Sequence, residues 1–148
     1  MEILFVCTGN TCRSPTAEAL LRRALADRGV SGVTAGSAGT GAWDGSPASE
    51  GAYLVGLENG LDLSSHRARL LTRELIRSAD LILTMSAQQR ARVEAMGAGD
   101  KAHELTEYAG ATGDVNDPYG SDLDAYRRTY AELERLTEAV VARVTADR

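Results

Sequence analysis

The sequence predicts a single-domain α/β protein with a central four-stranded parallel sheet that is flanked by helices on both sides. Short apolar stretches of strand length alternate with longer stretches of helical periodicity along the 148 residues, as in folds built from parallel strands and right-handed crossovers. One of these apolar stretches is continuous, which is typical of a parallel strand covered on both faces. No repeat or linker divides the chain, so we expect one domain over residues 1–148.

The first strand and the first helix are predicted from the amino-terminal residues. Residues 2–6 (EILFV) form a short apolar stretch that reads as a buried strand. We expect Ser14 and Pro15 to open the following helix, because serine is a favourable N-cap and proline is favoured at the first helical position. Apolar residues then recur at helical spacing until Gly29, which is expected to end the helix.

The middle of the chain supplies two further strands and a helix between them. Residues 33–39 (VTAGSAG) predict a strand that ends in a glycine-rich turn. A helix is then expected to begin at Ser46-Pro47 and to run to Asn59-Gly60. Residues 79–85 (ADLILTM) are the continuous apolar stretch, and we expect a buried strand there.

The last third of the chain is expected to supply the fourth strand and two helices. Residues 86–96 (SAQQRARVEAM) predict a helix, and residues 101–105 (KAHEL) predict a short fourth strand. After Asp122, one apolar face of a long amphipathic helix is formed by Leu123, Tyr126, Tyr130, Leu133, Val140, Val141 and Val144.

Composition and charge exclude several classes of function. The net charge of −5 argues against a nucleic-acid-binding protein, whose surface would carry a basic patch. The short apolar stretch after Glu2 does not resemble a signal peptide, and no stretch is long enough for a membrane span. With two cysteines and no export signal, we expect a cytoplasmic protein without a nucleic-acid or membrane partner.

The segment from Cys7 to Arg13 is the candidate functional site. Cys7 follows the first strand directly, and parallel sheets bind ligands at the carboxyl ends of their strands. As a strand-to-helix loop, this segment can surround an anion with backbone N–H groups and with the amino-terminal end of the helix. Gly9 is expected to allow a tight turn, and Arg13 supplies a planar guanidinium that can bind two phosphate oxygens.

A cysteine in such a loop is expected to be a nucleophile. Helix amino termini and neighbouring cations stabilise a thiolate. The alternatives are that Cys7 is a small buried apolar residue and that Arg13 is solvated. Cys7, Cys12, His66 and His103 lack the spacing of a zinc site, so no metal is predicted, and the loop also lacks the Gly-Lys-Ser/Thr of a nucleotide-binding loop.

The stretch VCTGNTCRSPTAEALL at residues 6–21 resembles the signature of the low-molecular-weight protein phosphatases, which is Cys, five residues, Arg and then Ser. The resemblance continues through SAGT, SSHRAR, ADLILTM and NDPYG, and thus covers most of the chain. It implies a phosphate-binding loop after the first strand and hydrolysis of phosphorylated side chains through a phosphocysteine. The partners would be phosphorylated proteins and the product inorganic phosphate, with no cofactor.

The reaction also needs a proton donor for the leaving group. The segment GDVNDPYG offers two candidates, Asp114 and Asp117, and an aspartate before proline is commonly only a turn residue. The resemblance implies that the general acid is Asp117, in the Asp-Pro-aromatic motif.

The resemblance also assigns supporting roles around the phosphate. Asn10 would maintain the shape of the loop, and Ser14 would donate a hydrogen bond to the Cys7 thiolate. Ser37 and His66 would support the loop from behind, although a histidine such as His66, taken by itself, is more often a surface or core residue. Trp43 and Tyr119 would line the pocket, but Trp43 could equally be a core or rim residue. The remaining candidate substrate-binding residues are Thr8, Gly9, Thr11 and Cys12.

Thr11 bears on the choice of substrate. Most tyrosine-specific members of the family carry a bulky aliphatic residue there, and a threonine resembles the bacterial protein-arginine phosphatases. An apolar wall would leave guanidinium N–H groups unpaired, at a cost of ~1–3 kcal/mol each. SAGTGAW and Tyr119 resemble the tyrosine-specific branch instead. Thr11 favours phosphoarginine, with phosphotyrosine as the alternative.

Cys12 has two possible roles, and two other functions are compatible with parts of this site. The resemblance implies that Cys12 can form a reversible disulfide with Cys7, whereas the alternative is a small residue that packs within the loop. Arsenate reduction on this scaffold needs further cysteines, and both cysteines of this chain lie in the loop. A module that only binds anions would need neither Cys7 nor Asp117.

Overall fold

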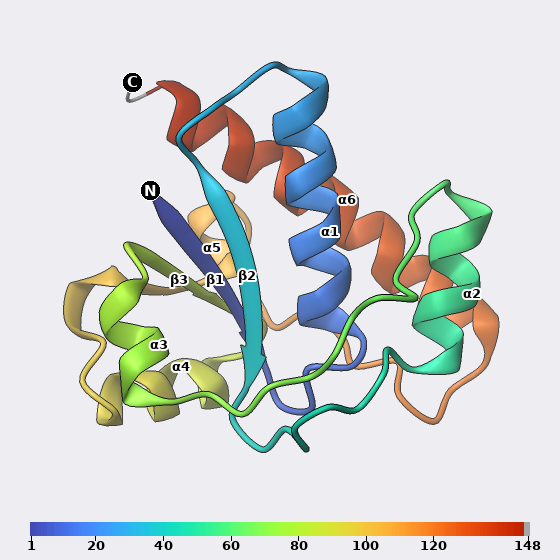
Figure 1. Ribbon diagram of the computed structural model, residues 1–148, viewed down its shortest axis with the longest axis horizontal. Helices are drawn as coiled ribbons and strands as arrows, with labels where there is room; N and C mark the ends of the chain where they lie inside the picture. Colours follow the sequence, from blue (N-terminus) through green and yellow to red (C-terminus); the bar gives the residue numbers. More distant parts are fainter. Residues whose placement is uncertain (147–148) are drawn as a thin grey trace.

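The computed structural model describes residues 1–146 and contains one sheet of four parallel strands. The strands are β1 (Glu2–Cys7), β2 (Thr34–Gly39), β3 (Leu81–Thr84) and β4 (Ala102–Glu104). Their order is β2-β1-β3-β4, and every pairing is parallel (Figure 1). The predicted fold class and the positions of all four strands are confirmed.

Helices cover both faces of this sheet. The helices are α1 (Arg13–Asp27), α2 (Glu50–Glu58), α3 (Arg73–Ser78), α4 (Ala87–Ala95), α5 (Leu105–Tyr108) and α6 (Leu123–Ala146). Figure 1 shows α1 and α6 on one side of the sheet and α3 and α4 on the other. Among residues 1–146, no helix combines the length and the apolar character that crossing a membrane requires.

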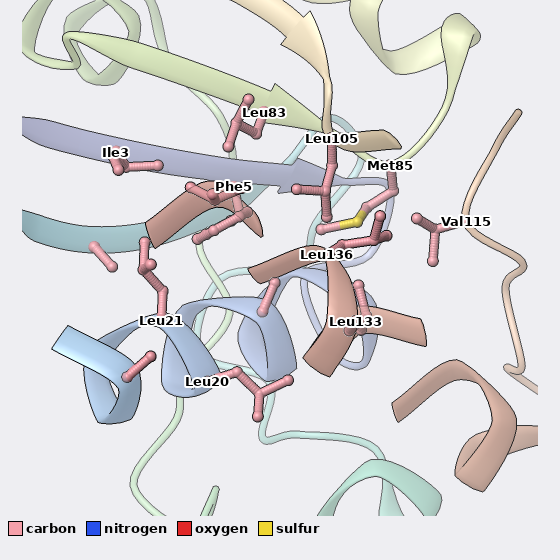
Figure 2. Packing of buried hydrophobic residues seen from close by; sticks show 14 of the residues in the cluster. Ile3, Phe5, Leu20, Leu21, Leu83, Met85, Leu105, Val115, Leu133 and Leu136 are labelled. Carbon is pink, nitrogen blue, oxygen red and sulfur yellow. The ribbon is translucent and has the colours of Figure 1, made fainter. Parts of the chain in front are cut away.

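Alternate side chains of β1 supply two separate cores. Ile3 and Phe5 pack with residues of α1 and α6, including Leu21 and Leu133 (Figure 2). The side chains between them, Leu4 and Val6, face the other way and pack against α3 and α4. Successive residues of a strand point to opposite faces, so the apolar EILFV stretch serves both cores.

Two helix starts differ from the sequence prediction. The α1 helix begins at Arg13, so Ser14 and Pro15 lie within its first turn rather than at its start. The α2 helix begins at Glu50 instead of at Ser46-Pro47. Backbone pairing explains the later start of α2, because the Ser46 carbonyl accepts a hydrogen bond from the Ala68 N–H group at 2.7 Å.

Two short helices are absent from the sequence prediction. The six residues of α3 and the four residues of α5 are too few to show a helical periodicity. Thr72 caps α3 by accepting a hydrogen bond from the Leu75 N–H group at 3.1 Å. A single capping residue without a following apolar pattern does not identify such a helix in advance.

Candidate active site

The segment from Cys7 to Arg13, called the cysteine loop below, connects β1 to α1 at the carboxyl end of the sheet. Cys7 is the last residue of β1 and is only 2% exposed. It lies at a cavity of about 500 Å³. The lining residues are Cys7, Thr8, Gly9, Thr11, Cys12, Arg13, Gly41, Trp43, Ser46, Pro47, Ala48, Ser49, Asp117 and Tyr119.

The tight turn of the cysteine loop lies at Asn10, which corrects the prediction for Gly9. Asn10 has a φ of 55°, in the left-handed region that asparagine tolerates better than most residues, whereas Gly9 is outside that region. A glycine is required next to the loop, at Gly39. A Cβ atom there would lie 2.4 Å from the Thr8 carbonyl oxygen, so the loop packs directly on the end of β2.

The sulfur of Cys7 is surrounded by polar groups. Its Sγ atom lies 2.8 Å from the Ser14 hydroxyl oxygen, and the backbone N–H of Asn10 donates to it at 3.2 Å. Ser14 and Asn10 are both completely buried. The helix that begins at Arg13 also directs its amino-terminal end towards this region. These surroundings suit a sulfur anion better than a neutral apolar side chain.

Asn10, Ser37 and His66 come together behind the loop. The Asn10 amide nitrogen donates to the hydroxyls of Ser14 at 2.8 Å and Ser37 at 2.9 Å. Nε2 of His66 lies 2.7 Å from the Asn10 carbonyl oxygen. Arg69, which the sequence did not single out, donates its backbone N–H to the Asn10 side-chain oxygen at 3.0 Å. The surroundings of His66 are therefore those of the cysteine loop rather than of open surface.

Arg13 is buried and has one unpaired donor. Its Nη1 group donates to the Val115 carbonyl at 3.1 Å, and Nη2 lies 3.5 Å from a carboxylate oxygen of Asp117. The Nε–H group is buried and has no hydrogen-bond partner among residues 1–146. Buried donors in native proteins are almost always satisfied, so this group points to a ligand that accepts a hydrogen bond.

The two candidate acids occupy different places. Asp117 lines the cavity, its side chain is 49% exposed, and its carboxylate also contacts the Cys12 sulfur at 3.6 Å and the Tyr119 N–H at 3.1 Å. Asp114 instead accepts a hydrogen bond from the Ala87 N–H at 3.0 Å, at the start of α4. Only Asp117 of this pair lies beside Arg13.

The two cysteines are both free thiols, and Cys12 is held in its neutral form. Burial raises the pKa of the Cys12 thiol to about 12, and the neighbouring Cys7 and Asp117 contribute in the same direction. A neutral thiol is a poor nucleophile, so these surroundings make Cys12 poorly suited to attack a substrate.

Trp43 and Tyr119 lie at the rim of the cavity. Their exposed fractions are 83% and 71%, which excludes the core alternative for Trp43. Thr11 lies on the wall, and its carbonyl accepts a hydrogen bond from the Ser49 N–H at 2.8 Å. This bond ties the extended residues before α2 to the loop.

Several contributors to the site have no signal in the sequence. Gln89 is buried in α4 and donates to the Thr8 hydroxyl at 3.1 Å, and Val115 acts only through its backbone carbonyl. Neither residue type nor spacing distinguishes them from ordinary helix and loop residues. Within residues 1–146, no group of three or more His, Cys, Asp or Glu side chains is arranged to bind a metal ion.

Comparisons with known proteins place the chain among phosphatases by sequence. The family described as "Low molecular weight phosphotyrosine protein phosphatase" matches residues 2–148. The probable low molecular weight protein-tyrosine-phosphatase EpsP of Ralstonia solanacearum is 40% identical over 149 residues, covering 97% of this chain and 96% of that protein. The protein-arginine-phosphatase of Bacillus subtilis (strain 168) is 40% identical over 151 residues, covering 100% of this chain and 99% of that protein.

A solved structure shares the whole architecture. The YwlE arginine phosphatase, described as a C7S mutant with phosphorylated active site serine, has a TM-score of 0.93 to this chain at 40% identity. The match covers 100% of this chain and 98% of that one. With the family match over nearly every residue, these similarities lead to one conclusion: the chain belongs to the low molecular weight phosphotyrosine protein phosphatase family.

Proposed function

We propose that this protein removes phosphate from phosphorylated protein side chains through a phosphocysteine intermediate on Cys7. The observation that carries the proposal is the buried Nε–H group of Arg13, which has no hydrogen-bond partner within residues 1–146, in a residue that lines the same cavity as the buried Cys7. The guanidinium and the backbone N–H groups of the cysteine loop bind the phosphate oxygens and compensate their charge. Because the protein carries a net charge of −5, this local positive site must overcome an unfavourable overall field.

In the first step the Cys7 thiolate attacks phosphorus, and the bond from phosphorus to the substrate side chain breaks. Asp117, protonated at that moment, gives its proton to the leaving group. In the second step the Asp117 carboxylate takes a proton from water, the water oxygen attacks phosphorus, and Cys7 leaves as a thiolate with inorganic phosphate as the product. Ser14, at 2.8 Å from the sulfur, stabilises that thiolate by a hydrogen bond. The YwlE relative with a phosphorylated active-site serine supports a covalent intermediate at this position.

A chromogenic aryl phosphate series tests the mechanism. We expect Cys7→Ser to abolish turnover, and we expect Asp117→Asn to lower kcat by about 10²–10⁴-fold. In Asp117→Asn the rate should also fall steeply as the leaving group becomes more basic, because no proton is supplied. Asp114→Asn is the matched control, since the asparagine oxygen can still accept from the Ala87 N–H. Turnover that survives Cys7→Ser, or equal losses for the two aspartates, contradicts the assignment.

We further propose that the substrate side chain is phosphoarginine. The two relatives at 40% identity act, by their names, on different residues, so overall similarity does not decide between arginine and tyrosine. Thr11 lies on the cavity wall and offers a hydroxyl that can pair with a guanidinium N–H. Phosphotyrosine remains the competing substrate, because the exposed rings of Trp43 and Tyr119 suit an aromatic side chain equally well.

The substrate preference is tested by comparing kcat/KM for peptides that carry phosphoarginine and for peptides that carry phosphotyrosine. We expect the wild type to have the higher kcat/KM for phosphoarginine, and Thr11→Ile to shift the preference towards phosphotyrosine by about 10-fold or more, the effect of one unpaired buried donor. The proposal fails if the wild type prefers phosphotyrosine and Thr11→Ile changes nothing. Two free thiols at the site suit a reducing compartment, so we place this activity in the cytoplasm.

A further inference from the structure

Two long stretches of the chain that border the substrate cavity carry no basic side chain. Residues 29–66 and residues 102–126 contain no lysine or arginine, although both stretches contain several aspartates and glutamates. Trp43 lies in the first stretch and Tyr119 in the second, and both residues stand at the rim of the cavity. The charge along this part of the rim is therefore negative.

Three exposed carboxylates lie within three positions of a residue that lines the cavity. They are Asp44, Glu50 and Asp122, called the acidic rim below. Asp44 and Glu50 directly follow lining residues, and neighbouring Cα atoms are only about 3.8 Å apart. The Debye length is about 8 Å at physiological ionic strength, so salt screens charges incompletely over such distances. The field of the acidic rim therefore reaches a peptide that contacts the cavity.

No cation neutralises the acidic rim within residues 1–146. Oδ1 of Asp44 accepts a hydrogen bond from the Leu70 N–H group at 2.7 Å, and Oδ1 of Asp122 accepts one from the Ala125 N–H group at 2.9 Å. These bonds hold the two carboxylates in place without supplying a full positive charge. None of the three carboxylates forms an ion pair with a described residue.

Several arginines of the same region are engaged elsewhere. Arg67 and Arg69 line a separate polar cavity of about 300 Å³. Arg127 forms ion pairs with two other carboxylates, at 2.7 Å each. Among the described residues that line the substrate cavity, Arg13 is the only lysine or arginine. Positive charge is thus confined to the deep part of the cavity.

The deep part of the cavity has the opposite preference from the acidic rim. Arg13 is only 5% exposed, and its Nε–H group has no hydrogen-bond partner within residues 1–146. This buried donor points to an anionic ligand beside Cys7. A phosphoryl group suits this position, whereas an acidic side chain next to it in a substrate would meet the carboxylates of the acidic rim.

We propose that the protein acts on phosphorylated residues that are flanked by lysine or arginine, whose side chains pair with the acidic rim. The inference rests on the proposed function, because it takes the phosphoryl group to occupy the deep part of the cavity. It applies to phosphoarginine and phosphotyrosine alike, since the acidic rim meets the neighbouring residues of the substrate. Charge complementarity of this kind selects partners and speeds their association.

Matched peptides test the proposal in the wild type. Two peptides share one neutral sequence around a central phosphorylated residue and differ only two positions before and after it, where one has lysines and the other glutamates. Each exposed ion pair is worth about 1.5- to 5-fold in binding. We therefore expect kcat/KM to be about 10-fold higher for the lysine peptide, through KM rather than kcat, with phosphoarginine and with phosphotyrosine at the centre.

Salt separates this effect from a contact of another kind. At 1 M NaCl the Debye length is about 3 Å, so we expect the ratio of the two kcat/KM values to fall to about 2-fold or less. A wild type that treats the two peptides alike at low salt, or prefers the glutamate peptide, overturns the proposal. A ratio that persists unchanged at 1 M NaCl also overturns it.

Two triple variants with the same net charge locate the effect. Asp44→Asn, Glu50→Gln and Asp122→Asn together neutralise the acidic rim, and both asparagine oxygens still accept from the Leu70 and Ala125 N–H groups. The control combines substitutions of three exposed carboxylates at the other end of the sheet, after α1 and before β3 and β4. They are Asp27→Asn, Asp80→Asn and Asp100→Asn.

The ratio of the two kcat/KM values should fall to about 3-fold or less in the rim variant and stay near 10-fold in the control. Equal losses in both variants would mean that only the net charge matters, and would overturn the proposal. Thermal melting shows whether each variant is folded. The comparison of peptides in the wild type needs no variant, so it decides the matter even where a variant is unfolded.

Binding of the same peptides to Cys7→Ser, followed by fluorescence anisotropy, distinguishes this proposal from the proposed function. If the wild type hydrolyses neither peptide but Cys7→Ser binds the lysine peptide about 10-fold more tightly, the proposed function fails and the role of the acidic rim stands. If Cys7→Ser abolishes hydrolysis but the wild type treats both peptides alike, the function stands and the role of the acidic rim is wrong.

Discussion

At the scale of single residues, the two cysteines of one loop show how strongly local surroundings control reactivity. Cys7 receives the backbone N–H of Asn10 and lies next to the Ser14 hydroxyl. Cys12 is buried beside Cys7 and Asp117, and these surroundings raise its pKa to about 12. Although the two residues are only five positions apart, their surroundings differ, because a backbone N–H and a buried hydroxyl lie at the Cys7 sulfur, whereas burial dominates at Cys12.

This difference predicts selective modification. At neutral pH, iodoacetamide should alkylate Cys7 and leave Cys12 unmodified in the folded protein, since the Cys12 thiolate forms in quantity only as the pH approaches about 12. In denaturant both thiols should react alike. Peptide mapping after timed labelling measures both sites in one sample, and comparable rates at Cys7 and Cys12 in the folded state would contradict the prediction.

At the scale of elements, α2 packs very closely against α6. The residues directly before α2, 46–49, form part of the cavity wall. A Cβ atom at Gly51 would lie 2.4 Å from the ring of Tyr126, so only glycine allows this contact. The exposed ion pair between Arg127 and Glu58 adds a second link between the two helices at 2.7 Å. The position of the wall therefore depends on a glycine that has no chemical role.

Gly51→Ala should destabilise the protein although alanine is the better helix former. Relieving the contact with Tyr126 costs about 1–3 kcal/mol, which exceeds the gain of at most about 1 kcal/mol in helix propensity. Urea unfolding should show a lower midpoint. Gly41→Ala is the matched control, because a Cβ atom there meets its neighbours at 3.8 Å or more. An unchanged or raised stability of Gly51→Ala would show that α2 can move away from α6.

At the scale of the whole molecule, the sheet separates two cores of unequal size. The larger core joins β1 to α1, α2 and α6, and Leu133 is completely buried within it (Figure 2). The smaller core under α3 and α4 packs on the opposite face. Because α1 carries Arg13 and also forms the larger core, the arrangement of the active site depends on the stability of the domain.

Leu133→Ala should lower the free energy of unfolding by about 2–5 kcal/mol through the loss of buried surface and the cavity left behind. For a chain of this size the melting temperature falls by roughly 2–4 °C per kcal/mol. Leu57→Ala, at a position with 47% exposure, should change stability by less than about 0.5 kcal/mol. Calorimetry measures the melting temperatures of both variants. Similar melting temperatures for Leu133→Ala and Leu57→Ala would be evidence against the assigned core.

Local patterns were sufficient for much of the fold and for the location of the site. The four strands follow from apolar stretches of the right length, and the long α6 follows from its periodic apolar face. Cys7 and Arg13 could be found because both belong to one short strand-to-helix segment and are only six positions apart in the chain. Short-range order of this kind depends on neighbouring residues, which are visible in the sequence.

Only the tertiary structure decided what lies around that loop. The contact of Asp117 with Arg13, the different place of Asp114 at the start of α4, and the contact from Ser37 to Glu18 all join segments that are distant in the chain. The exposed rim position of Trp43 likewise depends on the packing around it. The α2 helix also begins later than the sequence predicts, because the Ser46 carbonyl pairs with the Ala68 N–H group. These contacts form only when the packing of the two cores brings the segments together, and packing depends on three-dimensional shape that no local pattern encodes.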